Sequence, residues 1–202
     1  DRVYPTPGLL DGREPTGDVV VRERGLNLLV RPQEGPDVGV YVDMRPVRAW
    51  LAPSWGATRV LNTFCYTGAF SVAAAYNGAS EVVSVDLSAG VLDRVRANFA
   101  ANDLPSDSFE FVADDTFKAL DRFRRQGRKF DRIVLDPPSF SRGVEIWSAK
   151  RDYPRLVAAA CRVLDPEGWI VCASNQGQLS PKQFRGFVAD GVLKAGRQAQ
   201  EI

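Results

Sequence analysis

The sequence predicts an α/β fold built on a mostly parallel sheet. From Thr58 onward, short apolar runs alternate with helical patterns, which is typical of successive strand–helix units. The 202 residues, 45% hydrophobic and 25% charged, suit one ordinary globular domain with a substantial core.

The region before Thr58 is expected to form a linker rather than part of the sheet. Its elements, in order, are an extended Pro- and Gly-rich arm at 1–17, a hairpin of 19–21 and 26–30 turning at Gly25, a strand at 38–42, and a helix opened by Pro46. We therefore divide the chain into an arm and β-hairpin linker, 1–50, and a main domain, 51–202.

Five strands and five helices are predicted in the main domain. The strands are 59–64, 81–85, 109–112, 130–135 and 169–173. The helices that follow them are 69–76, 89–101, 116–125, 153–164 and 181–193.

Composition excludes several classes of chemistry. The chain has no histidine, so mechanisms that need imidazole as base or metal ligand are excluded. Cys65, Cys161 and Cys172 are scattered, which indicates neither a disulfide framework nor a zinc site, and no metal is expected.

With no signal peptide or membrane-spanning run, a cytoplasmic location is the default expectation. The net charge of +1 shows no strong attraction to a polyanion, although cations crowd 122–129 and 142–151.

Ligands of open parallel sheets bind beyond the carboxyl ends of the strands, where the strand order reverses. After the first strand, the turn at 62–70 has one glycine, Gly68, beside the hydroxyl of Thr67. It lacks the Gly-x-Gly-x-x-Gly spacing that holds a diphosphate, so an adenosine without a diphosphate suits it better. A plain strand-to-helix turn is the alternative interpretation.

Carboxylates follow the second and third strands. Asp86 comes roughly 20 residues after the glycine turn, where an acid can accept both ribose hydroxyls of an adenosine. Asp115, which follows Asp114, is placed to accept from an adenine amino group, with Phe117 nearby. Helix N-capping is the alternative role, for which Ser88 is a better candidate than Asp86.

The most specific motif is Asp136-Pro137-Pro138-Ser139-Phe140, after the fourth strand. Two prolines remove two backbone donors and stiffen the segment. We expect Asp136 and the Pro137 carbonyl to bind the edge of a flat heterocycle, with Phe140 packing on its face. The alternative is that these residues form an ordinary turn with no role in binding.

Together these stretches resemble class I S-adenosylmethionine (SAM)-dependent methyltransferases. More narrowly, they resemble the bacterial large-subunit rRNA methyltransferase family, which has cytosine-C5 and guanine-N7 members. The resemblance covers residues 18–195 and is carried by 39–45, 62–70, 85–86, 115–117 and 135–140. It implies a Rossmann-like class I sheet with an N-terminal β-hairpin extension, SAM as the cofactor and a base in rRNA as the acceptor.

The resemblance also implies the roles of site residues. The loop that borders the amino-acid half of SAM comprises Asn62, Phe64, Tyr66, Thr67 and Gly68. Asp86, with Ser88, is the ribose residue, and Asp115 is the adenine residue. Arg45 is the cation at the SAM carboxylate. Asp136 borders both SAM and the base, with Pro137 and Phe140 on the base side.

One position departs from the cytosine-C5 branch, in which a cysteine thiolate after the fifth strand attacks the base. Asn175 aligns with that cysteine, and Cys172 falls inside the strand. The Ser-Asn-Gln stretch is closer to the guanine-N7 branch, whose target nitrogen needs no covalent help. Asn175 is therefore a catalytic candidate.

Other features of the family are not seen in this sequence. Its sheet normally finishes with an antiparallel hairpin, and many members carry an additional RNA-binding module. The oligomeric state is open, with a homodimer as one alternative. Methyl transfer to a small molecule or protein, and a catalytically idle SAM-binding module, remain alternatives, whereas the missing diphosphate glycines disfavour a nicotinamide-dependent oxidoreductase.

Overall fold

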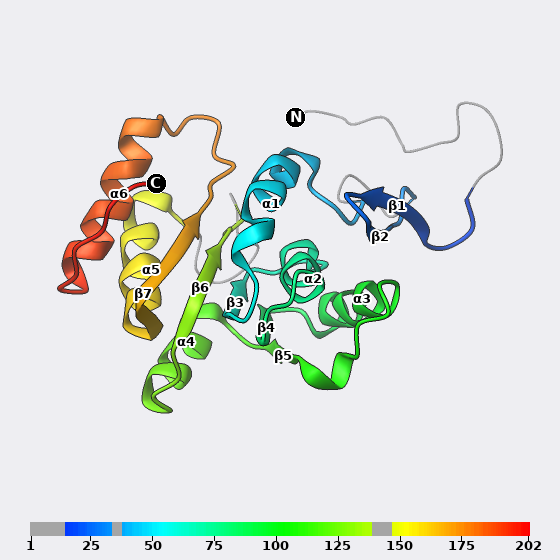
Figure 1. The fold of residues 1–202 in the computed structure, drawn as a ribbon. Helices are drawn as coiled ribbons and strands as arrows, with labels where there is room; N and C mark the ends of the chain where they lie inside the picture. Colours follow the sequence, from blue (N-terminus) through cyan, green and yellow to red (C-terminus); the bar gives the residue numbers. More distant parts are fainter. Residues whose placement is uncertain (1–14, 34–37, 139–146) are drawn as a thin grey trace.

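The computed structural model describes residues 15–33, 38–138 and 147–202. A five-stranded sheet lies at the centre, and a two-stranded hairpin lies apart from it (Figure 1). The strands are β1 (Val19–Glu23), β2 (Leu26–Val30), β3 (Arg59–Thr63), β4 (Glu81–Asp86), β5 (Glu110–Ala113), β6 (Phe130–Leu135) and β7 (Leu164–Cys172). The α-helices are α1 (Arg45–Leu51), α2 (Ala69–Tyr76), α3 (Ala89–Ala100), α4 (Thr116–Arg125), α5 (Ala149–Val163) and α6 (Pro181–Lys194).

The main sheet is parallel and runs in the order β5-β4-β3-β6-β7. The chain builds outward from β3 through β4 to β5, and then crosses to the other side of β3 to add β6 and β7. The strand order therefore reverses between β3 and β6. This reversal opens a crevice at the carboxyl ends of these two strands, where the sequence places its candidate residues.

Helices cover both faces of the sheet. Alternate residues of each strand point to opposite faces, so Leu61 and Ile133 pack with α4, α5 and α6, whereas Val60 and Val134 pack with α1, α2 and α3. Both faces are apolar, as a parallel sheet covered on two sides requires. No helix in the described ranges is both long and apolar enough to cross a membrane.

The N-terminal hairpin turns at Arg24 and Gly25. Both residues have positive φ, 49° and 89°, and Glu23 pairs directly with Leu26, which matches a two-residue type I′ turn. Backbone and side-chain groups of Asn27 bond to Asn102 and Ala101 at the end of α3. The hairpin is thereby fixed against the α2–α3 face of the main domain.

Residues 38–42 do not form the predicted strand. Gly39 has a φ of 123°, and a short 3₁₀ turn at Val42–Met44 leads directly into α1. Arg31 N donates to the Val38 carbonyl, so this segment is held against the end of β2 without joining a ladder. The predicted boundary at residues 50/51 falls within α1, and the division of the chain stays a prediction.

Candidate functional site

A cavity of about 420 Å³ lies at the carboxyl edge of the sheet. It is walled by the segments that follow β3, β4, β5, β6 and β7, together with the segment before α1. Its lining residues are Val40, Tyr41, Asp43, Met44, Arg48, Asn62, Phe64, Cys65, Tyr66, Thr67, Ala69, Phe70, Asp86, Leu87, Asp114, Asp115, Thr116, Asp136, Pro137, Pro138, Ala173, Ser174 and Asn175. Its volume is within the range of small-molecule sites.

The turn after β3 has an unusual backbone. Phe64 and Tyr66 have φ values of 54° and 48°, and Gly68 has 81°. A positive φ costs a non-glycine residue about 1–3 kcal/mol and persists only where the surroundings enforce it. Here Cys65 N donates to the Val85 carbonyl, and Gly68 N donates to the Cys65 carbonyl. The strained turn therefore brings Phe64, Tyr66 and Thr67 to the cavity wall.

Gly68 belongs to the same turn but does not line the cavity. It caps the N-terminus of α2, and a Cβ at this position would lie 2.5 Å from Cγ1 of Val95. The Thr67 hydroxyl donates to the Gly39 carbonyl, and Nδ2 of Asn98 donates to the Thr67 carbonyl at 2.8 Å. The turn is thus fixed on both sides, against the linker and against α3.

Asn62 lies on the floor of the cavity and is 2% exposed. Its Nδ2 donates to the Ser71 hydroxyl at 2.9 Å, and the Ser84 hydroxyl donates to the same oxygen at 2.8 Å. This buried polar chain joins β3, α2 and β4 beneath the site.

Asp86 ends β4 and faces the cavity. Tyr66 N and Ser88 N donate to its two carboxylate oxygens, each at 3.1 Å. These bonds orient the carboxylate and leave lone pairs that can accept from a ligand. Ser88 caps α3 by accepting from Val91 N and does not line the cavity, which matches its alternative role.

Asp114 and Asp115 both line the cavity at the end of β5. Asp114 is ion-paired with Arg122. Asp115 caps α4 by accepting from Lys118 N at 3.1 Å, so it performs the capping role while facing the cavity. Phe117 points elsewhere and lines a separate groove between α4 and α5.

Asp136 follows β6 directly and lies across the cavity from Asp86. Burial, together with the nearby charge of Asp43, raises the pKa of Asp136 to about 6, and Arg48 acts in the opposite direction. Pro137 is buried and lines the same wall. The predicted base-stacking residue, Phe140, lies outside the described residues.

Arg48 is the one cation among the described lining residues. Its Nε and Nη2 donate to the two oxygens of Glu23 at 2.8 and 2.6 Å, and both groups are nearly buried. Arg45, which the sequence interpretation chose, is exposed and does not line the cavity. The sequence interpretation did not name Tyr41, Asp43 or Arg48 as site residues, because the path of residues 38–44 and the pairing of Arg48 with Glu23 depend on contacts that are distant in the sequence.

The segment after β7 completes the wall with Ala173, Ser174 and Asn175. The buried hydroxyl of Tyr153 donates to the Ala173 carbonyl at 2.9 Å and also lies 3.3 Å from the Leu135 carbonyl. Tyr153 therefore holds the ends of β6 and β7 in register, next to Asp136.

Covalent methyl transfer needs a thiolate, and the two cysteines nearest the site are Cys65 and Cys172. Burial raises the pKa of Cys172 to about 12, and this residue does not line the cavity. Cys65 does line it, but burial and the Asp86 charge raise the pKa of its thiol well above the usual value. Both sulfurs are thus held in the unreactive thiol form. Within the described ranges, no group of three or more Cys, Asp or Glu side chains could hold a metal ion.

The donor set fits an adenosine ligand without a diphosphate. One oriented carboxylate ends β4, two more follow β5, and aromatic and apolar side chains line the same cavity. A family model described as S-adenosylmethionine-dependent methyltransferase matches residues 9–190. The chain belongs to this family.

Relatives of this SAM-dependent methyltransferase family support the same conclusion. The chain is 42% identical over 195 residues to ribosomal RNA large subunit methyltransferase I of Aeromonas hydrophila, and 40% identical over 194 residues to that of Aeromonas salmonicida. Each match covers 96% of this chain and 49% of the relative, so the chain spans about half the length of these curated proteins.

A solved structure shares both the fold and the cofactor class. SMU.776, assigned as a methyltransferase and crystallised in complex with SAH, superposes with a TM-score of 0.87 at 34% identity. The match covers 90% of this chain and 48% of that one. The Rossmann-like class I sheet with its hairpin extension is therefore confirmed, and SAM is the cofactor of the family.

Proposed function

We propose that this chain transfers the methyl group of SAM to a base in ribosomal RNA, in the cytoplasm. The observation that carries the proposal is that Asp86 and Asp136, 50 positions apart in the sequence, open onto one cavity. The relatives named for rRNA methylation supply the substrate class.

The first half of the cavity is proposed to hold the cofactor. Asp86 accepts from the ribose hydroxyls, because its two backbone bonds already fix the plane of the carboxylate. Asp115 accepts from the adenine amino group, and the turn at Phe64 and Tyr66 borders the amino-acid half. Arg48, the one cation among the described lining residues, is proposed in place of Arg45 beside the SAM carboxylate, while its Nε and Nη2 stay bonded to Glu23.

The second half is proposed to hold the base. SAM supplies a methyl group on a positively charged sulfur, which is a good leaving group. The chain has to align the acceptor with that methyl group, and alignment of this kind can lower a barrier by about 7–11 kcal/mol. Asp136 and the Pro137 carbonyl accept hydrogen bonds from the base edge, and Asn175 lies on the adjoining wall.

The acceptor atom is proposed to be a ring nitrogen with a lone pair. A carbon acceptor such as cytosine C5 needs a thiolate to activate the ring. Asn175 stands where such a thiol would be needed, while Cys65 and Cys172 are buried with raised pKa values. A nitrogen acceptor such as guanine N7 needs no covalent activation.

The test is methyl transfer from tritiated SAM to unmodified rRNA, followed by digestion and separation of the nucleosides. We expect label in a guanine nucleoside, and at least about 100-fold slower transfer by Asp136→Asn, the loss expected for one oriented hydrogen-bonding group. Asp93→Asn, an exposed carboxylate on α3, is the matched control and should leave the rate unchanged. Label confined to protein or small metabolites would overturn the RNA assignment.

A further inference from the structure

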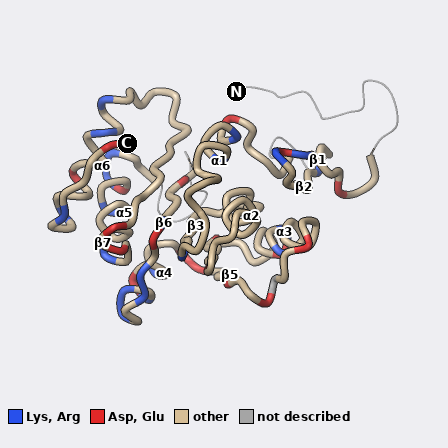
Figure 2. Tube along the Cα trace, in the orientation of Figure 1, with Lys and Arg blue, Asp and Glu red and all other residues tan. Residues whose placement is uncertain are grey.

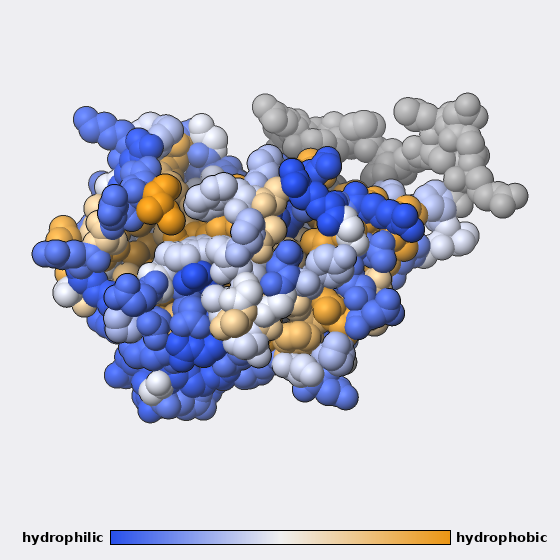
Figure 3. All heavy atoms as spheres, viewed as in Figure 1, coloured by the Kyte–Doolittle hydropathy of each residue, from blue (hydrophilic) through white to orange (hydrophobic). Residues whose placement is uncertain are grey.

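A second, basic groove lies between α4 and α5 and shares no residue with the cofactor cavity. Its volume is about 360 Å³, and it is lined by Phe117, Leu120, Asp121, Arg124, Arg155, Ala158, Ala159, Arg162 and Lys194. Figure 2 shows Lys and Arg gathered on α4 and α6, and Figure 3 shows the hydrophilic surface over α4.

The groove carries an excess of positive charge. Its wall has four cations and one carboxylate, Asp121, which is shared between Arg124 and Arg125. Lys194 is paired with Asp190 outside the groove. In the part of the chain that the structure describes, the exposed guanidinium of Arg162 makes no hydrogen bond or ion pair within contact distance, and it interacts with Asp121 only through the longer-range field. The local field is therefore that of an anion site, although the chain as a whole is nearly neutral.

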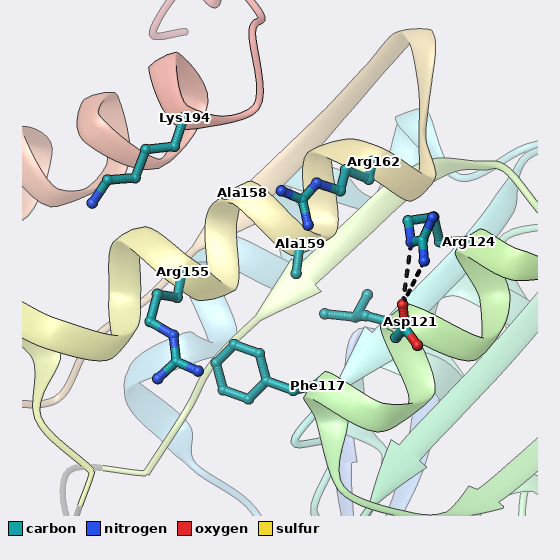
Figure 4. Close-up of a pocket in the computed structure, with 9 residues that line it drawn as sticks. Phe117, Asp121, Arg124, Arg155, Ala158, Ala159, Arg162 and Lys194 are labelled. Atoms are coloured by element: carbon teal, nitrogen blue, oxygen red, sulfur yellow. Dashed lines mark hydrogen bonds and ion pairs between the residues drawn. The ribbon is translucent and has the colours of Figure 1, made fainter.

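The shape of the groove suits an extended polyanion. Arg155 and Arg162 are seven residues apart, so they lie about 10.5 Å apart along the same side of α5. The short side chains of Ala158 and Ala159 lie between them, and Figure 4 shows these residues facing Phe117 and the Asp121–Arg124 pair of α4. Two cations at this spacing can contact two phosphates of one strand.

The position of Arg155 is fixed. Its guanidinium lies 5.3 Å from the centre of the Phe117 ring and 3.3 Å from an oxygen of Asp152. Asp152 is buried and is also paired with Arg151 at 2.8 Å. Stacking on an aromatic ring holds the planar group in place while its outer N–H groups remain available for a phosphate.

One end of the groove lies close to the functional site. Thr116 lines the cofactor cavity, and the next residue, Phe117, lines the groove, so one end of the groove lies at the rim of the site. A nucleic acid whose base enters the cavity can therefore continue along α4 and α5.

We propose that the α4–α5 groove binds the phosphate backbone of the RNA that carries the target base. This inference rests on the proposed function, and it assigns to Arg155 and Arg162 the contacts that hold the strand beside the cavity. Phosphate contacts of this kind position the substrate and carry no sequence information.

The test measures binding of a fluorescein-labelled single-stranded RNA between 50 and 200 mM salt, on the order of the range where counterion release is strong. The groove variant is Arg155→Gln/Arg162→Gln, and the matched control is Arg22→Gln/Arg96→Gln, which removes two exposed cations from β1 and α3. Each lost contact should reduce the slope of log K against log salt by about 0.7, so affinity near 0.1 M salt should fall by roughly 25-fold.

Arg155→Lys/Arg162→Lys, which keeps both charges, should retain most of the affinity. Calorimetry with SAM checks the fold of each variant and should give unchanged affinity, because neither arginine lines the cofactor cavity. A groove variant that binds RNA as tightly as the control, or a control that weakens binding equally, would overturn the proposal. If the groove variant loses RNA binding but the parent chain transfers no methyl group, the result supports the groove and contradicts the proposed function. If the parent chain transfers the methyl group but the groove variant binds RNA unchanged, the result supports the proposed function and contradicts the groove.

Discussion

Replacing Asp136 by Asn should stabilise the free protein while it removes a residue proposed for the reaction. The pKa of Asp136 is raised from 3.8 to about 6, because burial and Asp43 disfavour its charged form. Each pH unit of a pKa change represents about 1.36 kcal/mol, so keeping this group ionised costs the folded state roughly 3 kcal/mol. An amide at this position avoids that cost.

The sign of the pH dependence follows from proton binding. Between pH 3.8 and about 6, the folded state holds the Asp136 proton more tightly than the unfolded state does. The contribution of Asp136 to stability is therefore fully present below pH 3.8 and is lost as the pH rises through 6. The stability difference between Asp136→Asn and the parent should be constant below about pH 4, and should grow by roughly 3 kcal/mol by pH 8.

The assay is urea denaturation of both proteins at pH 4, 5, 6 and 8, values chosen to span roughly the range in which the group titrates. Asp43→Asn is the control, because it removes one cause of the raised pKa and should recover part of the same stability. A stability difference that does not change with pH would refute the reasoning. So would an Asp136→Asn protein less stable than the parent at pH 8.

Three further predictions concern the cofactor turn and the thiols. Asp86→Asn should weaken SAM binding by roughly 10- to 100-fold in calorimetry, because a charged acceptor is lost; a change below about threefold would contradict its role. Cys172→Ala should transfer methyl groups within about twofold of the parent rate, since its thiol stays protonated; a loss of two orders of magnitude would indicate a covalent route instead. Gly68→Ala should destabilise the fold by at least about 2 kcal/mol more than Gly127→Ala, measured by urea midpoints. Both positions have positive φ, but only a Cβ at Gly68 meets Val95; equal midpoints would show that this clash is absent.

Most of the main domain could be predicted from periodicity and turn chemistry. The helices at 69–76 and 116–125 and the strand at 130–135 have the predicted bounds. The prediction begins this helix at residue 153, next to Pro154, whereas α5 begins at Ala149. The structure instead accommodates this proline inside the helix.

The site was predictable wherever its residues follow strands, because parallel topology brings the carboxyl ends together. Asp86, Asp115 and Asp136 reach the cavity for this reason. The linker was harder, since nothing local in the sequence shows that residues 38–42 pack against the turn after β3. Arg48 was missed because its position depends on a buried partner, Glu23, that lies 25 residues away in the hairpin.

Two predicted residues, Ser88 and Gly68, do not line the cavity, for a common reason. Both adjoin lining residues in the sequence, but the Ser88 hydroxyl caps α3, and Gly68 is the N-cap residue of α2, with its Cα packed against Val95. Spacing alone places a residue near a site. The local backbone geometry then decides whether its polar groups face the ligand.

The most direct test of the account is a crystal structure of the chain with S-adenosylhomocysteine. The account predicts the ribose against Asp86, and the sulfur directed toward the wall formed by Asp136, Pro137 and Asn175. Cofactor density outside this cavity, or a sulfur directed away from Asp136, would contradict it.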